Sequence, residues 1–180
     1  KSVGKTGKFI VKEFQNEYFV RHALILDTFL ETPEEALFEE AVSVAASFAC
    51  TLNTQESLLD LLFVGTQAYC LTGGHGVSPV EHMLEVLASV QPSTSHKFES
   101  LKELVIQRAT LVSACICVFL DWKEARQDLV RELQIVAVPL LVLVMKVRSE
   151  DDPEPGPMQD DQEHFRVIEP GKVEEALGQL

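Results

Sequence analysis

The sequence predicts an α/β protein with a doubly wound, mostly parallel sheet and helices on both faces, which is a Rossmann-like architecture. Several segments are apolar along most of their length, as strands buried on both faces must be. Amphipathic helical patterns separate these segments, and each parallel connection needs such a covering helix. The chain has 180 residues, so we expect a single domain over residues 1–180.

The first two predicted strands are Lys8–Phe14 and Val20–Asp27. The second contains the run Ala23–Leu26, which is apolar on both faces. A strand of this kind belongs in the middle of a sheet, so we expect it beside the other fully apolar strand, which begins at Ala114.

A helix is predicted next, because the residues that precede it form a capping box. Thr32 supplies the capping hydroxyl, Pro33 occupies the first helical position, and Glu35 completes the box. The helix is expected to end near Asn53. One apolar stripe follows its length and consists of Leu37, Ala41, Val44 and Phe48.

The middle of the chain predicts two strands and a second capped helix. Leu58–Val64 is a buried strand, and Gln67–Leu71 is a shorter one after a tight turn at Gly65. A glycine-rich loop over Gly73–Gly76 then leads to a helix that Ser78 caps. The apolar face of this helix consists of Val80, Met83, Leu84 and Leu87.

Two more helices flank the apolar strand Ala114–Leu120. The first has an apolar face formed by Phe98, Leu101 and Val105. The second is expected to bury a stripe made of Trp122, Ala125, Leu129 and Leu133. Its charged residues are expected to face water, and these are Lys123, Glu124, Arg126, Asp128, Arg131 and Glu132.

The last long strand is predicted over Val138–Val147. Residues 149–163 contain seven acidic residues and three prolines but no basic residue, so we expect a mobile acidic surface loop. A strand over His164–Ile168 and a short helix over Lys172–Leu177 are expected to close the chain.

Composition excludes several functional classes. The chain has 15 Lys and Arg against 28 Asp and Glu, a net charge of -13, which argues against binding nucleic acid. The longest apolar run, Ile135–Met145, is far shorter than the roughly 20 residues of a membrane helix, so no membrane contact is expected. The four cysteines lack metal-binding spacing, and we expect free thiols and a cytoplasmic location. The chain opens on Lys1, which suggests part of a longer protein.

Two acidic residues follow predicted central strands at their carboxyl ends. Asp27 and Asp121 could share a hard cation such as Mg²⁺ if their strands are neighbours. Alternatively, each aspartate simply begins a loop, because aspartate favours turns and caps. The five histidines have no ligand spacing, and no G-x-S-x-G nucleophile motif is present.

A series of short motifs occurs in order along the chain, namely residues 5–14 (KTGKFIVKEF), 24–28 (LILDT), 118–121 (VFLD), 152–154 and 169–171. Together they resemble the von Willebrand factor A-like domain of the bacterial family called domain of unknown function 58. Residues 5–14 (KTGKFIVKEF) resemble the end of that family's signature before its first core strand. Residues 24–28 (LILDT) are similar to its metal-site strand, and residues 118–121 (VFLD) to its fourth strand. Residues 152–154 and 169–171 resemble its closing turns.

The resemblance implies a metal-ion-dependent adhesion site that this sequence matches only in part. The family pattern is Asp-x-Ser-x-Ser after the first strand, with a Thr from a later loop and an Asp after the fourth strand. Asp27 and Asp121 match, but Phe29 and Glu31 stand at the two serine positions. Ser78 could supply the loop hydroxyl, although the capping box explains it equally well. A degenerate metal site is therefore expected, and no other cofactor.

The resemblance also implies a non-enzymatic protein-interaction domain that works with a MoxR-type AAA+ ATPase, in a parent chain with membrane helices. The expected partner-binding rim is formed by residues 28–32, the loop 73–78 and residues 121–122. Its expected binding residues are Thr28, Phe29, Glu31, Ser78, Asp121 and Trp122. Trp122 could equally be a core residue. The alternative function is a metal-dependent hydrolase or nucleotide-binding enzyme that uses Asp27, Glu31 and Asp121.

Overall fold

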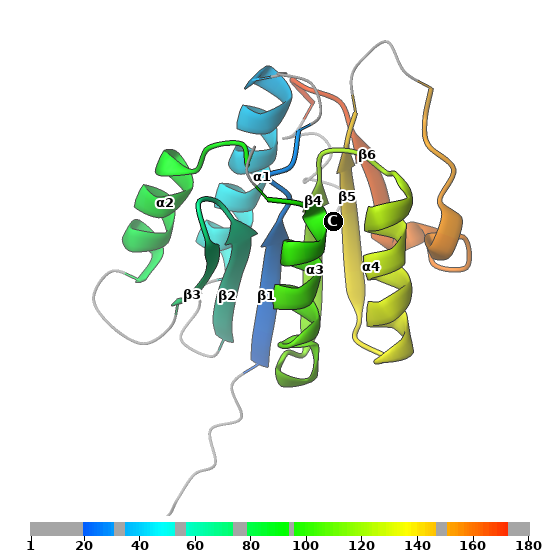
Figure 1. Cartoon of the computed structure of the whole chain (residues 1–180), viewed down its shortest axis with the longest axis horizontal. Coiled ribbons are helices and arrows are strands. Elements are labelled where there is room, and N and C mark those ends of the chain that lie inside the picture. Colours follow the sequence, from blue (N-terminus) through cyan, green and yellow to red (C-terminus); the bar gives the residue numbers. More distant parts are fainter. Residues whose placement is uncertain are drawn as a thin grey trace, which may run out of the picture.

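A six-stranded sheet runs through the middle of the computed structural model, which describes residues 20–30, 35–52, 57–73, 79–93, 96–146 and 151–172 (Figure 1). The strand order is β3-β2-β1-β4-β5-β6, and only β3 runs antiparallel to its neighbour. The strands are β1 (Val20–Leu26), β2 (Ser57–Val64), β3 (Ala68–Gly73), β4 (Ala114–Phe119), β5 (Leu140–Met145) and β6 (Phe165–Ile168). The predicted doubly wound α/β fold class is confirmed.

The predicted neighbours β1 and β4 pair in parallel at the centre of the sheet, where Leu24 lies opposite Ile116. The inner residues of both strands are buried because helices cover both faces of the sheet. The carboxyl ends of β1 and β4 therefore lie side by side, which places Asp27 close to the residues that follow β4.

The helices divide between the two faces (Figure 1). One apolar core lies between the sheet and α1 (Glu35–Leu52) and α2 (Pro79–Ser89). The other lies between the sheet and α3 (Phe98–Ile106) and α4 (Glu124–Ile135). Alternate side chains of each strand point into opposite cores, as the pleat of a strand requires.

A tight hairpin makes β3 antiparallel. The Gly65 backbone N–H donates to the carbonyl oxygen of Gln67 at 2.9 Å, which reverses the chain within a few residues. As a result Gly73, at the end of β3, pairs with Leu59, near the start of β2. The loop that begins at Gly73 therefore leaves from the amino edge of the parallel strands. The expectation that this loop begins on the same rim as Asp27 is wrong.

The element boundaries differ from the prediction mainly around β5. It covers Leu140–Met145 and begins later than predicted, because the chain turns at residues 136–137 after α4, where Ala137 has a φ of 59°, and joins the sheet only at Leu140. Several predicted features lie outside the described residues, namely the strand Lys8–Phe14, the capping residues Thr32 and Pro33, and nearly all of the helix Lys172–Leu177.

The described part of the acidic segment, residues 151–163, is attached to the domain. It contains the short 3-10 helix η2 (Gly156–Met158) and most of a second one, η3 (Gln162–His164), which ends one residue after the segment. Met158 is buried, and the Gln134 side-chain amide donates to the carbonyl oxygen of Pro157 at 2.8 Å. The mobility expected for this segment stays a prediction.

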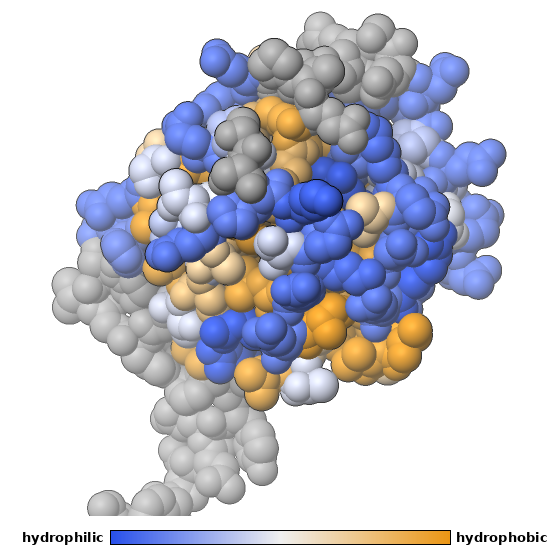
Figure 2. All heavy atoms as spheres, viewed as in Figure 1, coloured by the Kyte–Doolittle hydropathy of each residue, from blue (hydrophilic) through white to orange (hydrophobic). Residues whose placement is uncertain are grey.

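Hydrophilic residues cover much of the face seen in Figure 2, and hydrophobic residues come to the surface mostly near its lower edge. The large hydrophobic residues that are exposed in the described part of the chain all lie near the amino ends of the parallel strands, and they are Val20, Leu111, Ile135 and Val136. None of the helices described in the structure is both long enough and apolar enough to span a bilayer.

Candidate functional site at the carboxyl ends of the strands

Asp27 follows β1 directly and is completely buried. Its backbone N–H donates to the carbonyl oxygen of Val118 in β4 at 2.9 Å, so the pairing of the two strands continues through this residue. The carboxylate consequently lies under the chain that leaves β4, and solvent does not reach it.

Three N–H donors surround the Asp27 carboxylate. Oδ1 accepts a hydrogen bond from the backbone of Phe29 at 2.9 Å. Oδ2 accepts one from the backbone of Leu120 at 3.2 Å and another from Nε of Arg126 at 2.9 Å. These bonds use both oxygens and compensate the carboxylate for the water that burial removes.

Arg126 brings the cation to this site from the first turns of α4. Only 5% of the residue is exposed, and its guanidinium lies 4.4 Å from the centre of the Phe98 ring. One terminal nitrogen, Nη2, donates to the carbonyl oxygen of Phe29 at 3.0 Å. The planar guanidinium therefore joins the loop after β1 to α3 and α4.

The expectation that Arg126 faces water is wrong. Arg126 precedes the buried residues Leu129, Val130 and Leu133 at helical spacing, so it lies on the buried stripe of α4. That spacing was the available signal. Its charge suggested exposure, and the sequence did not reveal the carboxylate that pairs with Arg126, because that carboxylate follows a distant strand.

Burial raises the pKa of the Asp27 carboxyl, because desolvation disfavours its charged form. The charge of Arg126 and the backbone N–H groups of Phe29 and Leu120 act in the opposite direction. The ion pair with Arg126 therefore offsets part of the cost of placing a carboxylate in the core.

Asp121 lies at the same edge, after β4, and its side chain is 24% exposed. Its Oδ1 accepts a hydrogen bond from the backbone of Lys123 at 2.9 Å, which forms a turn just before α4. The same oxygen lies 3.4 Å from Nε of Arg126. The two predicted aspartates are thus brought together, with the Arg126 guanidinium between them.

The other predicted rim residues are mostly core residues. Thr28 is completely buried, and its hydroxyl donates to the carbonyl oxygen of Val64 in β2. Phe29 is 8% exposed, with its ring edge to face against that of Phe98 at 5.9 Å between centroids. Glu31 and Ser78 lie outside the described residues.

Trp122 is also a core residue. It is 8% exposed, and its ring lies 5.0 Å from that of Phe165 and 6.0 Å from that of Phe119, measured between centroids. Its indole N–H donates to the carbonyl oxygen of Glu154 at 2.9 Å, so it holds the acidic segment against the domain.

Sequence reasoning missed Ser93, which comes from the loop after α2. The backbone N–H of Ser93 donates to the carbonyl oxygen of Thr28 at 2.7 Å, so this loop reaches the residue next to Asp27. The Ser93 hydroxyl is buried and has no hydrogen-bond partner among the described residues. Only its place between two helices could have suggested the position.

No protein-family model and no curated protein matches the sequence. Solved structures do match. A von Willebrand factor type A protein from Catenulispora acidiphila superimposes with a TM-score of 0.60 at 11% identity, over 87% of this chain and 40% of that one. Proximal thread matrix protein 1 from the mussel byssus does so with a TM-score of 0.58 at 10% identity, over 89% of this chain and 44% of that one.

These similarities show that the chain has a von Willebrand factor A-like fold, and at such low identity they show the fold alone. The chain spans less than half the length of either protein that it matches.

Proposed function

We propose that this chain is a non-enzymatic protein-interaction domain in which the Arg126 guanidinium takes the place that a metal ion has in adhesion sites of this fold. The family proposed is the bacterial domain of unknown function 58, on the basis of the short motifs described above. The observation that carries the proposal is the contact of Arg126 Nε with Asp27 at 2.9 Å and with Asp121 at 3.4 Å.

The residues present do not fit Mg²⁺. That ion requires near-octahedral oxygen ligands at about 2.1 Å and usually keeps several waters. Both carboxylate oxygens of Asp27 already accept hydrogen bonds, and Phe29 offers no ligand at the next position of the pattern. A divalent cation beside the guanidinium would also meet electrostatic repulsion. These contacts support a degenerate metal site.

The same contacts argue against the hydrolase alternative. A general base or a metal ligand needs access to substrate or water, whereas Asp27 is completely buried and tied to Arg126. We therefore infer that Asp27 has a structural role here instead of a catalytic one.

Because several predicted rim residues are buried, fewer of them are accessible to a partner protein than the sequence suggested. At the rim, Asp121 is partly exposed, Lys123 is exposed and Glu124 has a side chain that is 74% exposed. On the proposed family resemblance, the partner is a MoxR-type AAA+ ATPase. A cytoplasmic location and a membrane-anchored parent chain belong to the same proposal.

Calorimetric titration with Mg²⁺ and Mn²⁺ tests the metal part of the proposal. We expect no heat of specific binding to the wild-type chain. Micromolar affinity that Asp121→Asn weakens, in a variant with an unchanged circular dichroism spectrum, would contradict the proposal.

Biolayer interferometry with the MoxR-type ATPase of the same organism tests the partner. We expect saturable binding that weakens when Lys123→Glu and Glu124→Arg reverse the charges of the exposed rim. The matched control is Glu163→Lys, whose side chain is 80% exposed and lies on the acidic segment. Turnover of phosphate esters or nucleotides by the isolated chain would favour an enzyme instead.

A further inference from the structure

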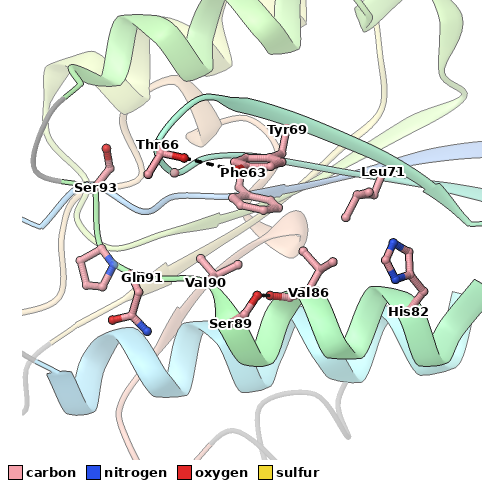
Figure 3. Close-up of a pocket in the computed structure, with 12 residues that line it drawn as sticks. Phe63, Thr66, Tyr69, Leu71, His82, Val86, Ser89, Val90, Gln91 and Ser93 are labelled. Carbon is pink, nitrogen blue, oxygen red and sulfur yellow. Dashed lines mark hydrogen bonds between the residues drawn. The ribbon is translucent and has the colours of Figure 1, made fainter.

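A groove of about 480 Å³ lies between the β2–β3 hairpin and α2, on the face of the sheet that α1 also covers. Tyr69 and Leu71 of the edge strand β3 form one wall, and His82 and Val86 of α2 form the other (Figure 3). Its volume lies in the range of natural ligand sites, roughly 300–1,000 Å³. The groove adjoins the rim described above, since Gly65 and Ser93 line one end.

The floor of the groove, next to the wall that Tyr69 forms, is apolar. The Phe63 and Tyr69 rings stack with centroids 4.8 Å apart and an angle of 11° between their planes. The Tyr69 hydroxyl lies 3.3 Å from that of Thr66, and the Ser89 hydroxyl donates to the Val86 carbonyl at 2.8 Å, so both alcohols are held in place. Such a floor suits apolar side chains of a bound segment.

β3 has one free edge among the described strands, because it pairs only with β2. An edge strand offers unpaired backbone N–H and C=O groups to any extended chain beside it. A strand added next to β3 would place every second side chain on the same face as Tyr69 and Leu71. Strand addition combined with side-chain pockets is an established way of recognising extended peptides.

The charge of the residues around the groove indicates the charge of its occupant. No Lys or Arg occurs between Arg21 and Lys97, while that stretch contains ten acidic residues. It builds α1, β2, β3 and α2. Glu81 and Glu85 of α2 are exposed, the second with 79% of its side chain in solvent. The described residues that line the groove include no Lys or Arg. The surroundings therefore attract a basic segment.

We propose that an extended segment of a partner protein binds in this groove by adding a strand to β3, and that this segment has apolar residues at alternate positions and lysine or arginine at its ends. The apolar side chains would pack on Phe63 and Tyr69. The terminal basic side chains lie beyond the paired residues, so they could reach Glu81 and Glu85 of α2 on the same face of the sheet. This inference rests on the proposed function, since it names the surface and the partner chemistry of an interaction domain.

The test uses a fluorescein-labelled peptide with the sequence Lys-Lys-Val-Thr-Phe-Thr-Val-Lys-Lys and fluorescence anisotropy with the whole chain. We expect saturable binding that weakens by about tenfold in the double variant Glu81→Lys and Glu85→Lys, because two attractive contacts become repulsive. Glu163→Lys serves as the matched control and should leave binding unchanged. Equal weakening by the control would overturn the proposal.

Two control peptides test the mode of binding. A peptide with glutamate at each lysine position should bind much more weakly, and so should one in which alternate backbone amides are N-methylated. Hydrogen exchange should slow at residues 69–72 when the basic peptide is added. Undiminished binding of the N-methylated peptide, or no slowing in β3, would overturn strand addition.

Other occupants would contradict the proposal in distinct ways. A dimer in sedimentation velocity that the double variant dissociates would assign the groove to a second copy of the chain. Carbodiimide cross-links from Lys8 or Lys12 to Glu81 or Glu85 within the free chain would assign it to the chain's own N-terminal segment. If the ATPase binds but the peptide does not, this inference fails and the proposed function stands. If the peptide binds but the ATPase does not, the groove binds basic segments as inferred and the proposed ATPase partner is wrong.

Discussion

Arg126 and Asp27 lie 99 residues apart in the sequence, yet Arg126 Nε donates to Asp27 Oδ2 at 2.9 Å in the core of the domain. The pair connects the loop after the central strand β1 to α4. It accounts for a charged residue on the buried stripe of a helix and for a carboxylate that solvent does not reach.

We predict that Arg126→Met lowers the free energy of unfolding by about 3–5 kcal/mol, because it leaves the Asp27 carboxylate buried without its cation. Replacing both partners, with Asp27→Leu and Arg126→Met, should cost much less than the sum of the single changes. Urea denaturation of the four proteins measures the coupling. Arg131→Ala, in an exposed ion pair, is the control and should have little effect. Additive costs would contradict a coupled pair.

Two neighbouring hydroxyls should respond differently to removal. Thr28→Val is expected to cost about 1 kcal/mol, because it breaks a buried hydrogen bond to Val64. Ser93→Ala should leave stability unchanged or raise it, since the Ser93 hydroxyl has no partner among the described residues. Thermal and urea denaturation measure both changes. A larger loss for Ser93→Ala than for Thr28→Val would show that this hydroxyl has a partner in solution.

Trp122 should control the attachment of the acidic segment. Trp122→Ala is expected to cost about 3–5 kcal/mol, because it removes a buried ring that packs on Phe119 and Phe165. Trp122→Phe keeps most of that packing but loses the hydrogen bond to Glu154. In this second variant, hydrogen exchange should accelerate at residues 152–158 more than elsewhere. Unchanged exchange there would mean that other contacts hold the segment.

Alkaline pH should destabilise the domain through its buried thiols. Burial raises the pKa of the Cys115 thiol to about 12 and that of Cys117 well above its usual range. Because the folded state keeps both protons, their contribution to stability is complete below about pH 8.5 and is lost as the pH rises toward 12.

Urea denaturation at several pH values checks this prediction. Between pH 8.5 and pH 11, the free energy of unfolding should fall more steeply for the wild type than for the double variant Cys115→Ala and Cys117→Ala. Cys50 is exposed, so Cys50→Ala should keep the wild-type slope. Parallel slopes for all three proteins would contradict the prediction.

The fold was largely predictable from residues that are close in sequence. Runs such as Ala23–Leu26 and Ala114–Leu120 indicated central strands, and the periodic stripe that includes Leu129 and Leu133 indicated α4. The direction of β3 was not predictable in this way, because a short strand after a turn has the same pattern whether it runs parallel or antiparallel. That direction moved Gly73 to the opposite edge of the sheet from Asp27.

The site was predictable only in part. Asp27 and Asp121 were found because both follow central strands, and parallel neighbours end at the same edge of a sheet. The burial of Thr28 and Phe29 was not evident, because polar and aromatic residues at a strand end can face either the solvent or the core. For Trp122, the core was one of two alternatives. Arg126 was misjudged because its charge suggested exposure and the carboxylate that pairs with it follows a distant strand.

Local patterns along the chain are therefore enough to predict most of the described strands and helices, because hydrophobic periodicity acts between residues a few positions apart. The pairing of Asp27 with Arg126, the approach of Ser93 to Thr28 and the groove beside β3 depend on strand order and register. Those contacts join residues that are distant in sequence, and they form only when the sheet and its covering helices pack together.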